Sequence, residues 1–188
     1  MKRKIAVIAL VVLVATGITT ASSFTTATLS RDTSINVVND AQGVIALGDE
    51  LPGDVIRQDS SSGELKIDFT VGSASGVNVD SVYELGDPAN PVSTAGFNVT
   101  NNDQTGHSVT LNYSVTSGDG TANAYNETEF QVYRSDGTPI TTVSEEDNGA
   151  SFSLTSGETV YVVVIVDTTD GGIDQNDDLS GTLEVSAT

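Results

Sequence analysis

The strongest constraint on the fold is an alternation of apolar and polar residues with a period of two. It is clearest where Val109, Leu111, Tyr113 and Val115 alternate with polar side chains. Successive side chains of a strand point to opposite faces, so this pattern predicts a strand with one buried face. Shorter forms of the alternation recur at residues 65–71, 97–101, 130–134, 152–154 and 181–185.

Residues 159–166 (TVYVVVIV) are apolar at both odd and even positions. A strand with this composition is covered on both faces, so we expect it at the centre of a sheet. Residues 135–139 (SDGTP) are typical of a hairpin turn between two strands. Residues 140–143 then predict the returning strand.

The remaining segments give weaker predictions. Residues 40–47 favour a turn followed by a short strand, and residues 82–85 a short strand before a turn at Pro88 and Pro91. Residues 49–63 contain Pro, Gly and a serine run, and we expect an exposed loop there. No helix is expected beyond the N-terminal segment. The whole pattern of nine or ten short strands predicts an all-β fold, an antiparallel β-sandwich of the jelly-roll or immunoglobulin-like kind.

The N-terminus has the pattern of an export signal. Lys2, Arg3 and Lys4 precede an uncharged apolar stretch, residues 5–21, which ends in small residues. Its 17 residues are at the lower limit for a membrane-spanning helix, so an uncleaved anchor is the alternative to a cleaved signal helix. We therefore expect residues 1–21 to be a signal or anchor, residues 22–33 an extended arm and residues 34–188 the sandwich, with a first strand near residues 34–38. Either reading places the domain outside the cytoplasm, as a secreted or cell-surface protein.

The charge of the chain excludes several classes of partner. It has 26 acidic and seven basic residues, a formal net charge of −19, and removal of residues 1–21 leaves four basic residues and a charge of −22. Such a surface repels nucleic acid and anionic lipid, so neither is an expected partner. The acidity and the scarcity of lysine resemble the secreted proteins of halophilic archaea. Because cysteine is absent, the exported fold must be stable without disulfides.

No set of residues points to an enzyme. His107 is the only histidine, and we expect it on the polar edge of a strand. The pair Glu145–Glu146 is expected in a turn without the apolar surroundings that raise a carboxyl pKa. We predict no catalytic residues and no required cofactor.

One acidic loop has the residue types of a calcium site. Carboxylate and amide oxygens in a glycine-containing loop suit Ca²⁺, although the spacing is not that of an EF-hand. The candidate ligands are Asp167, Asp170, Asp174, Asn176 and Asp178. The alternative, a solvated hairpin loop, is the favoured interpretation, because a loop with several aspartates is expected in so acidic a chain. Three N-glycosylation patterns, as many as chance predicts, begin at Asn98, Asn112 and Asn126.

Several short motifs resemble a known family. They are Phe24 after the signal, Arg31-Asp32, Asp40-Ala41, Asp167-Thr168 and the terminal Ser180-Gly181-Thr182-Leu183. Together they are similar to archaeal secreted proteins grouped as a domain of unknown function, distantly related to biofilm fibre proteins of the camelysin and TasA type and to archaeal bundling pilins. The resemblance implies a sandwich that polymerises when an N-terminal arm completes a neighbour's sheet. In this chain the arm residues would be Phe24, Thr25, Ala27 and Leu29.

Three function classes follow. The first is a structural subunit of a fibre or pilus, whose partner is another copy of the chain or another surface protein. The second is a monomeric envelope or adhesion module on an uncleaved anchor. The third, an extracellular enzyme or solute-binding protein, is disfavoured because tryptophan is absent and aromatic residues make up only 5% of the chain.

Overall fold

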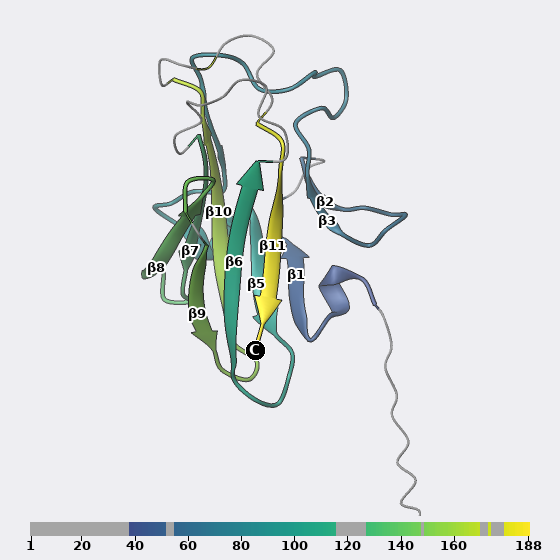
Figure 1. Cartoon of the computed structure of the whole chain (residues 1–188), viewed down its shortest axis with the longest axis vertical. Coiled ribbons are helices and arrows are strands. Elements are labelled where there is room, and N and C mark those ends of the chain that lie inside the picture. Colours follow the sequence, from purple (N-terminus) through teal and green to yellow (C-terminus); the bar gives the residue numbers. More distant parts are fainter. Residues whose placement is uncertain (1–37, 52–54, 116–126, 148, 170–172, 174–178) are drawn as a thin grey trace, which may run out of the picture. The chain divides into compact units, whose positions relative to one another are not determined.

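The computed structural model describes residues 38–51, 55–115, 127–147, 149–169, 173 and 179–188. Eleven strands in antiparallel pairs dominate these residues, which confirms the predicted all-β fold (Figure 1). The two short helical turns are η1 (Asp40–Gln42) and α2 (Pro91–Thr94). The strands are β1 (Ile45–Asp49), β2 (Ile56–Gln58), β3 (Leu65–Ile67), β4 (Val82–Leu85), β5 (Phe97–Asn101), β6 (His107–Val115), β7 (Thr128–Tyr133), β8 (Pro139–Ser144), β9 (Ala150–Leu154), β10 (Thr159–Asp167) and β11 (Gly181–Ala187).

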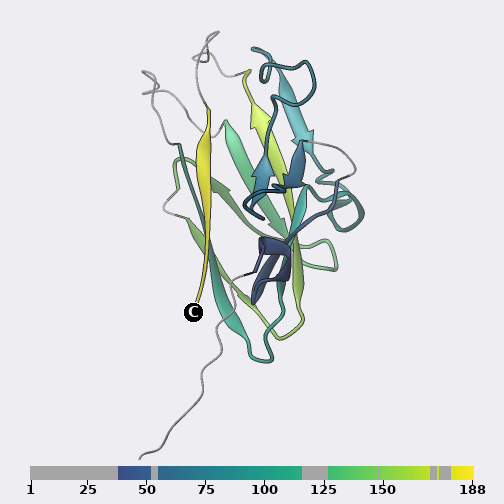
Figure 2. The ribbon, with the colours of Figure 1, turned by 90° about the vertical axis from the view of Figure 1, so that its right-hand side faces the viewer.

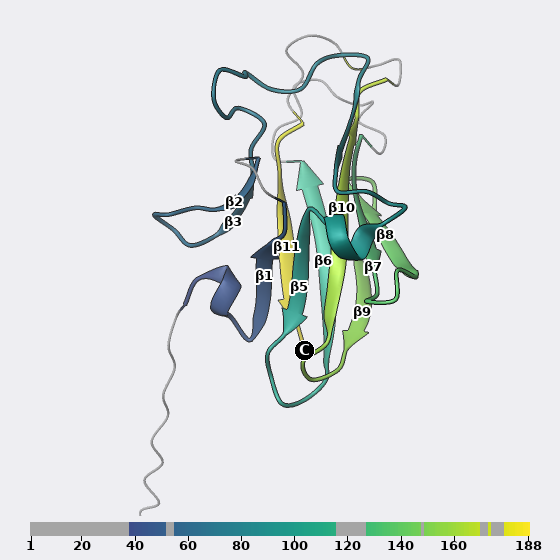
Figure 3. The ribbon, with the colours of Figure 1, turned by 180° about the vertical axis from the view of Figure 1, so that it is seen from behind.

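The larger sheet has the strand order β1-β5-β10-β7-β8, so β10 is its central strand as predicted. One side of β10 pairs with β7, and the other side pairs first with β5 and then with β4. The outer face of β10 is also covered, because α2 contacts it there (Figure 3). Val163 is consequently fully buried, although its neighbours Val162 and Val164 face the opposite side.

The smaller sheet has the order β11-β6-β9 and packs against the larger one. Figure 2 shows the two sheets from the side, with β11 in one layer and β10 in the other. Alternate side chains from both sheets fill the space between them, as expected for a sandwich. The fully buried members of this core are Phe97, Val99, Val109, Leu111, Val132, Val143, Leu154, Val160 and Val162.

Two predicted segments differ from the structure. The loop expected at residues 49–63 is wrong in part, because it contains β2, whose Ile56 is 1% exposed and belongs to the core. The strand expected at residues 65–71 ends at Ile67. There the carboxylate of Asp68 accepts hydrogen bonds from the backbone N–H and the hydroxyl of Thr70, which turns the chain. The first strand expected near residues 34–38 lies outside the described residues, except for Val38, which is in no strand.

The surface of this body is strongly acidic. Of the 26 acidic residues, 19 lie among the described residues. The described arginines and lysine each contact an acid: Arg57 contacts Asp68, Lys66 contacts Asp59, and Arg134 contacts Glu158. Exposed pairs of this kind contribute little each, so most of the acidic charge has no compensating base within the described residues.

We therefore predict that folding depends on salt. Raising sodium chloride from low to molar concentration should raise the melting temperature, because the Debye length falls to about 3 Å and the acids repel one another less. Thermal unfolding followed by circular dichroism checks this. Sucrose is the control, since it favours burial without screening charge. A melting temperature that sodium chloride leaves unchanged would contradict the prediction.

Candidate functional site

Two glutamate carboxyl groups meet at one end of the sandwich. Glu127 directly precedes β7 and is 2% exposed. Glu145 directly follows β8, and the pairing of Glu129 with Ser144 places it opposite the start of β7. Its carboxylate accepts a hydrogen bond from the backbone N–H of Glu127 at 2.7 Å and another from that of Thr128 at 3.3 Å. The side chain of Glu145 therefore closes the end of the β7–β8 pair.

The side chain of Glu127 lies close enough to the carboxyl group of Glu145 to influence its pKa. Burial, and then this contact with Glu127, raise the pKa of Glu145 from 4.5 to about 7. The Oε2 atom of Glu127 is buried and contacts no hydrogen-bond partner among the described residues. The arrangement suits the retention of one proton near neutral pH. It suits acid–base catalysis poorly, because Glu127 is hidden from any substrate.

This finding corrects one expectation from the sequence. Glu145 does lie in a turn, but the turn is not free of burial, and the pKa of Glu145 is raised. Glu146, the other member of the predicted pair, is exposed. The sequence does not associate Glu127 with Glu145, because 18 positions separate them and both lie among polar neighbours. The pairing of β7 with β8 brings them together.

The predicted calcium loop is described only at its start. Asp167 ends β10, and its carboxylate accepts hydrogen bonds from the backbone N–H of Thr169 at 2.9 Å and from the Thr169 hydroxyl at 2.6 Å. These bonds lower the pKa of Asp167. The other candidate ligands, Asp170, Asp174, Asn176 and Asp178, lie outside the described residues. Within the described ranges, no group of three or more acidic or histidine side chains could hold a metal ion.

The predicted glycosylation sites fall in different surroundings. Asn98 lies in β5 and donates a hydrogen bond from its side-chain amide to the carboxylate of Glu50. Asn112 lies in β6 and is half-buried. Asn126 is outside the described residues. The two described sites therefore lie within strands of the sandwich.

His107 was expected on the polar edge of a strand. In the structure it is the first residue of β6. Its Nε2 atom lies 2.7 Å from a carboxylate oxygen of Asp103. The hydroxyl of Thr105 donates to the same carboxylate oxygen at 2.9 Å. Through these contacts the side chain of His107 forms part of the turn between β5 and β6.

The outer edge of β11 is a second candidate, for binding rather than chemistry. Ser108 and Thr188 exchange both of their backbone hydrogen bonds, at 2.9 and 3.0 Å. Because strand residues alternate in direction, the backbone groups of Leu183, Val185 and Ala187 point away from β6. No described strand pairs with that side of β11. The edge thus offers a row of hydrogen-bonding groups to another strand.

The predicted arm residues Phe24, Thr25, Ala27 and Leu29 lie outside the described residues, as does the predicted signal or anchor. In the part of the chain that the structure describes, no helix has the length and hydropathy needed to cross a bilayer. A scan against protein-family models finds no match for this chain, and neither does a search of curated proteins.

Proposed function

We propose that this chain is a secreted structural subunit of the cell surface, which assembles into a fibre by donating its N-terminal arm to a neighbouring copy. The observation that carries this proposal is the open outer edge of β11. An extended segment that adds to such an edge satisfies the backbone groups and places alternate side chains against the core.

Two edges of the larger sheet, β8 and β1, are protected in ways that β11 is not. β8 begins with a proline, Pro139, and its pairing with β7 is interrupted by an irregularity between Val132 and Tyr133. At β1, the side-chain amide of Gln58 donates a hydrogen bond to the carbonyl oxygen of Leu47 at 3.0 Å. β11 has no proline and no lysine, and its only charged residue is Glu184. Natural proteins rarely leave an edge of this kind uncovered.

The side chains beneath the open edge favour a further strand. Leu183 and Val185 point toward the core but are only half-buried. A strand added beside β11 would cover them with its own apolar side chains, and Ala27 and Leu29 of the arm have suitable spacing. Residues 22–30 span about 30 Å when extended and β11 about 23 Å, at about 3.3 Å per residue. The arm is therefore long enough.

The direction of exchange favours a filament. An arm that leaves one copy and adds to the next makes a head-to-tail contact, which does not close on itself. The acidic surface does not oppose this at high salt, since screening shortens the range of repulsion. The resemblance to biofilm fibre proteins and bundling pilins, given by the short motifs above, agrees with this proposal.

We expect deletion of residues 22–30 to abolish filaments and leave a folded monomer. Electron microscopy in molar salt checks for filaments, and circular dichroism with sedimentation checks the fold and mass. The monomeric, anchored envelope module is the competing function. It predicts that the protein without its first 21 residues remains monomeric at high concentration, and that result would overturn the proposal.

The absence of cysteine allows the acceptor edge to be located by cross-linking. Copies that carry Thr28→Cys are mixed with copies that carry Glu184→Cys, an exposed position on β11, and a short thiol reagent is added. We expect dimers of the two variants. Ser153→Cys is the matched control, since it is exposed on β9, the opposite edge of the same sheet. Equal cross-linking at β9 would show that β11 is not the acceptor.

A further inference from the structure

The smaller sheet is narrower than the larger one and leaves part of it uncovered. β9 and β6 both contact β8, so the smaller sheet lies over the β8 side of the larger sheet. The strand order then places β11 toward the other side, where β1 is the edge strand. Figure 1 and Figure 3 show β11 and β1 on the same side of the sandwich, with β1 as the outer of the two. At this side the larger sheet therefore extends beyond the smaller one.

The burial of core-facing side chains decreases at the same side, in both sheets. Leu47 of β1 pairs with Val99 of β5, so both side chains face the core, yet Val99 is 0% exposed and Leu47 is half-buried. In the smaller sheet Val185 of β11 pairs with Leu111 of β6, and Val185 is half-buried while Leu111 is 0% exposed. The core is thus fully covered at β5 and β6 and only partly covered at β1 and β11.

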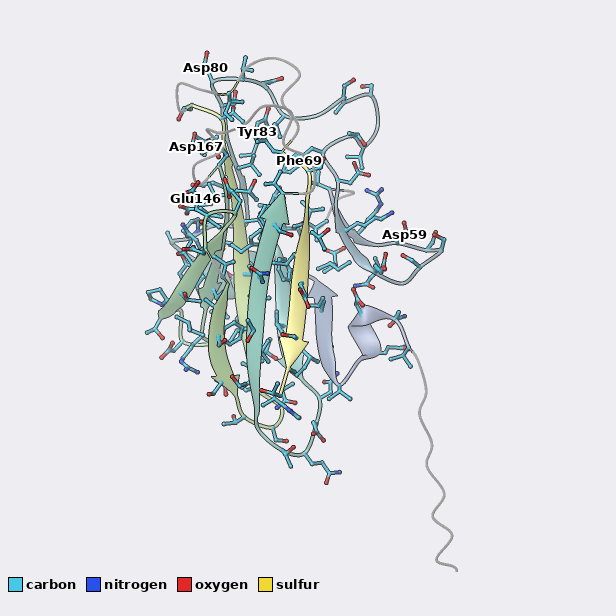
Figure 4. The ribbon with its side chains drawn as sticks, in the orientation of Figure 1. Asp59, Phe69, Asp80, Tyr83, Glu146 and Asp167 are labelled. Atoms are coloured by element: carbon cyan, nitrogen blue, oxygen red, sulfur yellow. The ribbon has the colours of Figure 1, made fainter. Side chains whose placement is uncertain are left out.

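The β2–β3 hairpin lies beside β1 at this side of the sandwich. Figure 4 shows Asp59, in the loop between β2 and β3, on the side of the molecule away from Glu146, which follows β8. Leu65 and Ile67 of β3 are half-buried and pack against the core. With the core-facing residues of the two edge strands they form one strip of half-buried apolar side chains. We call it the β1–β11 strip, and its members are Ile45, Leu47, Leu65, Ile67, Leu183 and Val185.

The hairpin lowers the charge that another copy of this acidic chain meets at the strip. Arg57 on β2 and Lys66 on β3 are two of the three arginines and lysines that the structure describes. They form ion pairs with Asp68 and Asp59 at 2.8 and 2.7 Å. Residues 55–68 contain these two basic residues and three acidic ones, so this part of the surface is nearly neutral. A second copy is therefore repelled less here than at the acidic remainder of the surface.

We propose that the β1–β11 strip is the acceptor surface for residues 22–30 of a second copy, which pair with β11 and pack against Ile45 and Leu47 of the opposite sheet. This inference rests on the proposed function and adds β1 to the acceptor. The sheets of a sandwich lie about 10 Å apart, a distance that the side chains of the two sheets span together. The inward side chains of a strand added beside β11 can therefore contact those of β1. The size of Ile45 and Leu47 then determines which arm residues fit.

The period of two decides which arm residues face β1. Ala27 and Leu29 lie two positions apart and point to one face of an extended arm, whereas Thr28 points to the other. The apolar face belongs toward the core, so Ala27 and Leu29 contact β1 and Thr28 faces solvent. Residues 22–30 contain no charged residue, so burial of the arm requires no desolvation of a charge. The described chain begins at Val38, next to η1, so the arm precedes the folded body and is available to a neighbour.

The first test uses the protein without its first 21 residues and needs no substitution. Hydroxyl-radical footprinting compares monomers with filaments that sedimentation separates. We expect the oxidation of Ile45, Leu47, Leu183 and Val185 to fall several-fold in filaments, because the arm covers all four. Val82 is the internal control, since it is 51% exposed on β4 and should keep its reactivity.

The outcomes of footprinting separate this inference from the proposed function. Protection of Leu183 and Val185 without protection of Ile45 and Leu47 would overturn the two-sheet acceptor and leave the donated arm intact. Protection that is already complete in the monomer would overturn it as well, because the arm of the same copy would then fill the strip. Closed dimers in which β11 pairs with β11 of another copy, or the absence of any filament, would overturn the proposed function and this inference with it.

The second test is cross-linking between the arm and β1. Copies that carry Ala27→Cys or Leu29→Cys are mixed with copies that carry Leu47→Cys, and a short thiol reagent is added. We expect dimers of the two variants. Thr28→Cys is the matched control, since it should cross-link to Glu184→Cys on the outer face of β11 but not to Leu47→Cys. Equal cross-linking of Thr28→Cys and Ala27→Cys to Leu47→Cys would show that the arm does not lie between the sheets with its apolar face inward.

Discussion

Replacing Phe97 with alanine is expected to lower the free energy of unfolding by about 3–5 kcal/mol, the largest effect of any single substitution considered. Phe97 is 0% exposed in β5, between β1 and β10. Its ring packs edge-on against that of Phe130 on β7, with 6.4 Å between ring centroids. Removal of the ring leaves a cavity in the middle of the larger sheet, which rigid strands on both sides cannot fill. For a protein of this size the melting temperature should fall by about 10 °C or more.

Urea unfolding followed by circular dichroism measures this loss. Phe97→Leu is the informative companion, because it keeps an apolar side chain and should lose clearly less. Val92→Ala is the surface control, since Val92 is 36% exposed in α2. If Phe97→Ala and Val92→Ala were equally stable, the packing of β5 at the centre of the core would be wrong.

The sequence predicts those strands that show a clear pattern of apolar residues within one continuous segment. β6 shows four apolar residues in strict alternation, and in the structure Val109, Leu111 and Tyr113 are buried while Val115 is half-buried. β10 is apolar at both parities and is covered on both faces. The hairpin between β7 and β8 follows from its turn residues, and Gly137 has the positive φ of 82° that such a turn needs.

Features that depend on distant parts of the chain are not predictable in this way. β2 is three residues long and contains a single apolar residue, Ile56, so no period can be recognised. The strand order of the larger sheet places β4, β5 and β7 beside β10, and no local pattern in the sequence predicts this order. The same reason applies to Glu127 and Glu145. They are 18 positions apart and lie just beyond the paired residues of β7 and β8, whereas a turn with two glutamates is expected to be exposed to solvent.

Asn101 shows the same limit in a structural role. The sequence places Asn101 at the end of a strand, in a polar Asn-Asn-Asp run that is typical of a turn. In the structure it is 0% exposed. Its amide group donates to the carbonyl oxygens of Thr105, Leu154 and Thr155 at 2.8, 3.1 and 3.1 Å, and its side-chain oxygen accepts from the N–H of Asp103 at 2.9 Å. It therefore joins the β5–β6 turn to the β9–β10 turn, and each of these turns connects one sheet to the other.

Asn101→Ala is expected to lower the free energy of unfolding by about 2–4 kcal/mol, because it leaves buried carbonyl oxygens without a donor. Asn101→Asp should be worse than alanine at neutral pH. A carboxylate has the same shape, but its charge would face three carbonyl oxygens in a buried position. Part of that extra loss should be recovered in acid, where the introduced carboxyl group is protonated and can donate one hydrogen bond.

The neighbouring asparagine provides the control for this prediction. Asn102 is exposed, and its side-chain amide makes a hydrogen bond to the carbonyl oxygen of Gly43 at 3.0 Å. Because water can replace that bond, Asn102→Ala should lower the free energy of unfolding by less than about 1 kcal/mol. Urea unfolding of the three variants, at neutral and acid pH, decides between the two roles. Similar losses for Asn101→Ala and Asn102→Ala would mean that the two turns are held together by the packing of their strands and not by the buried amide.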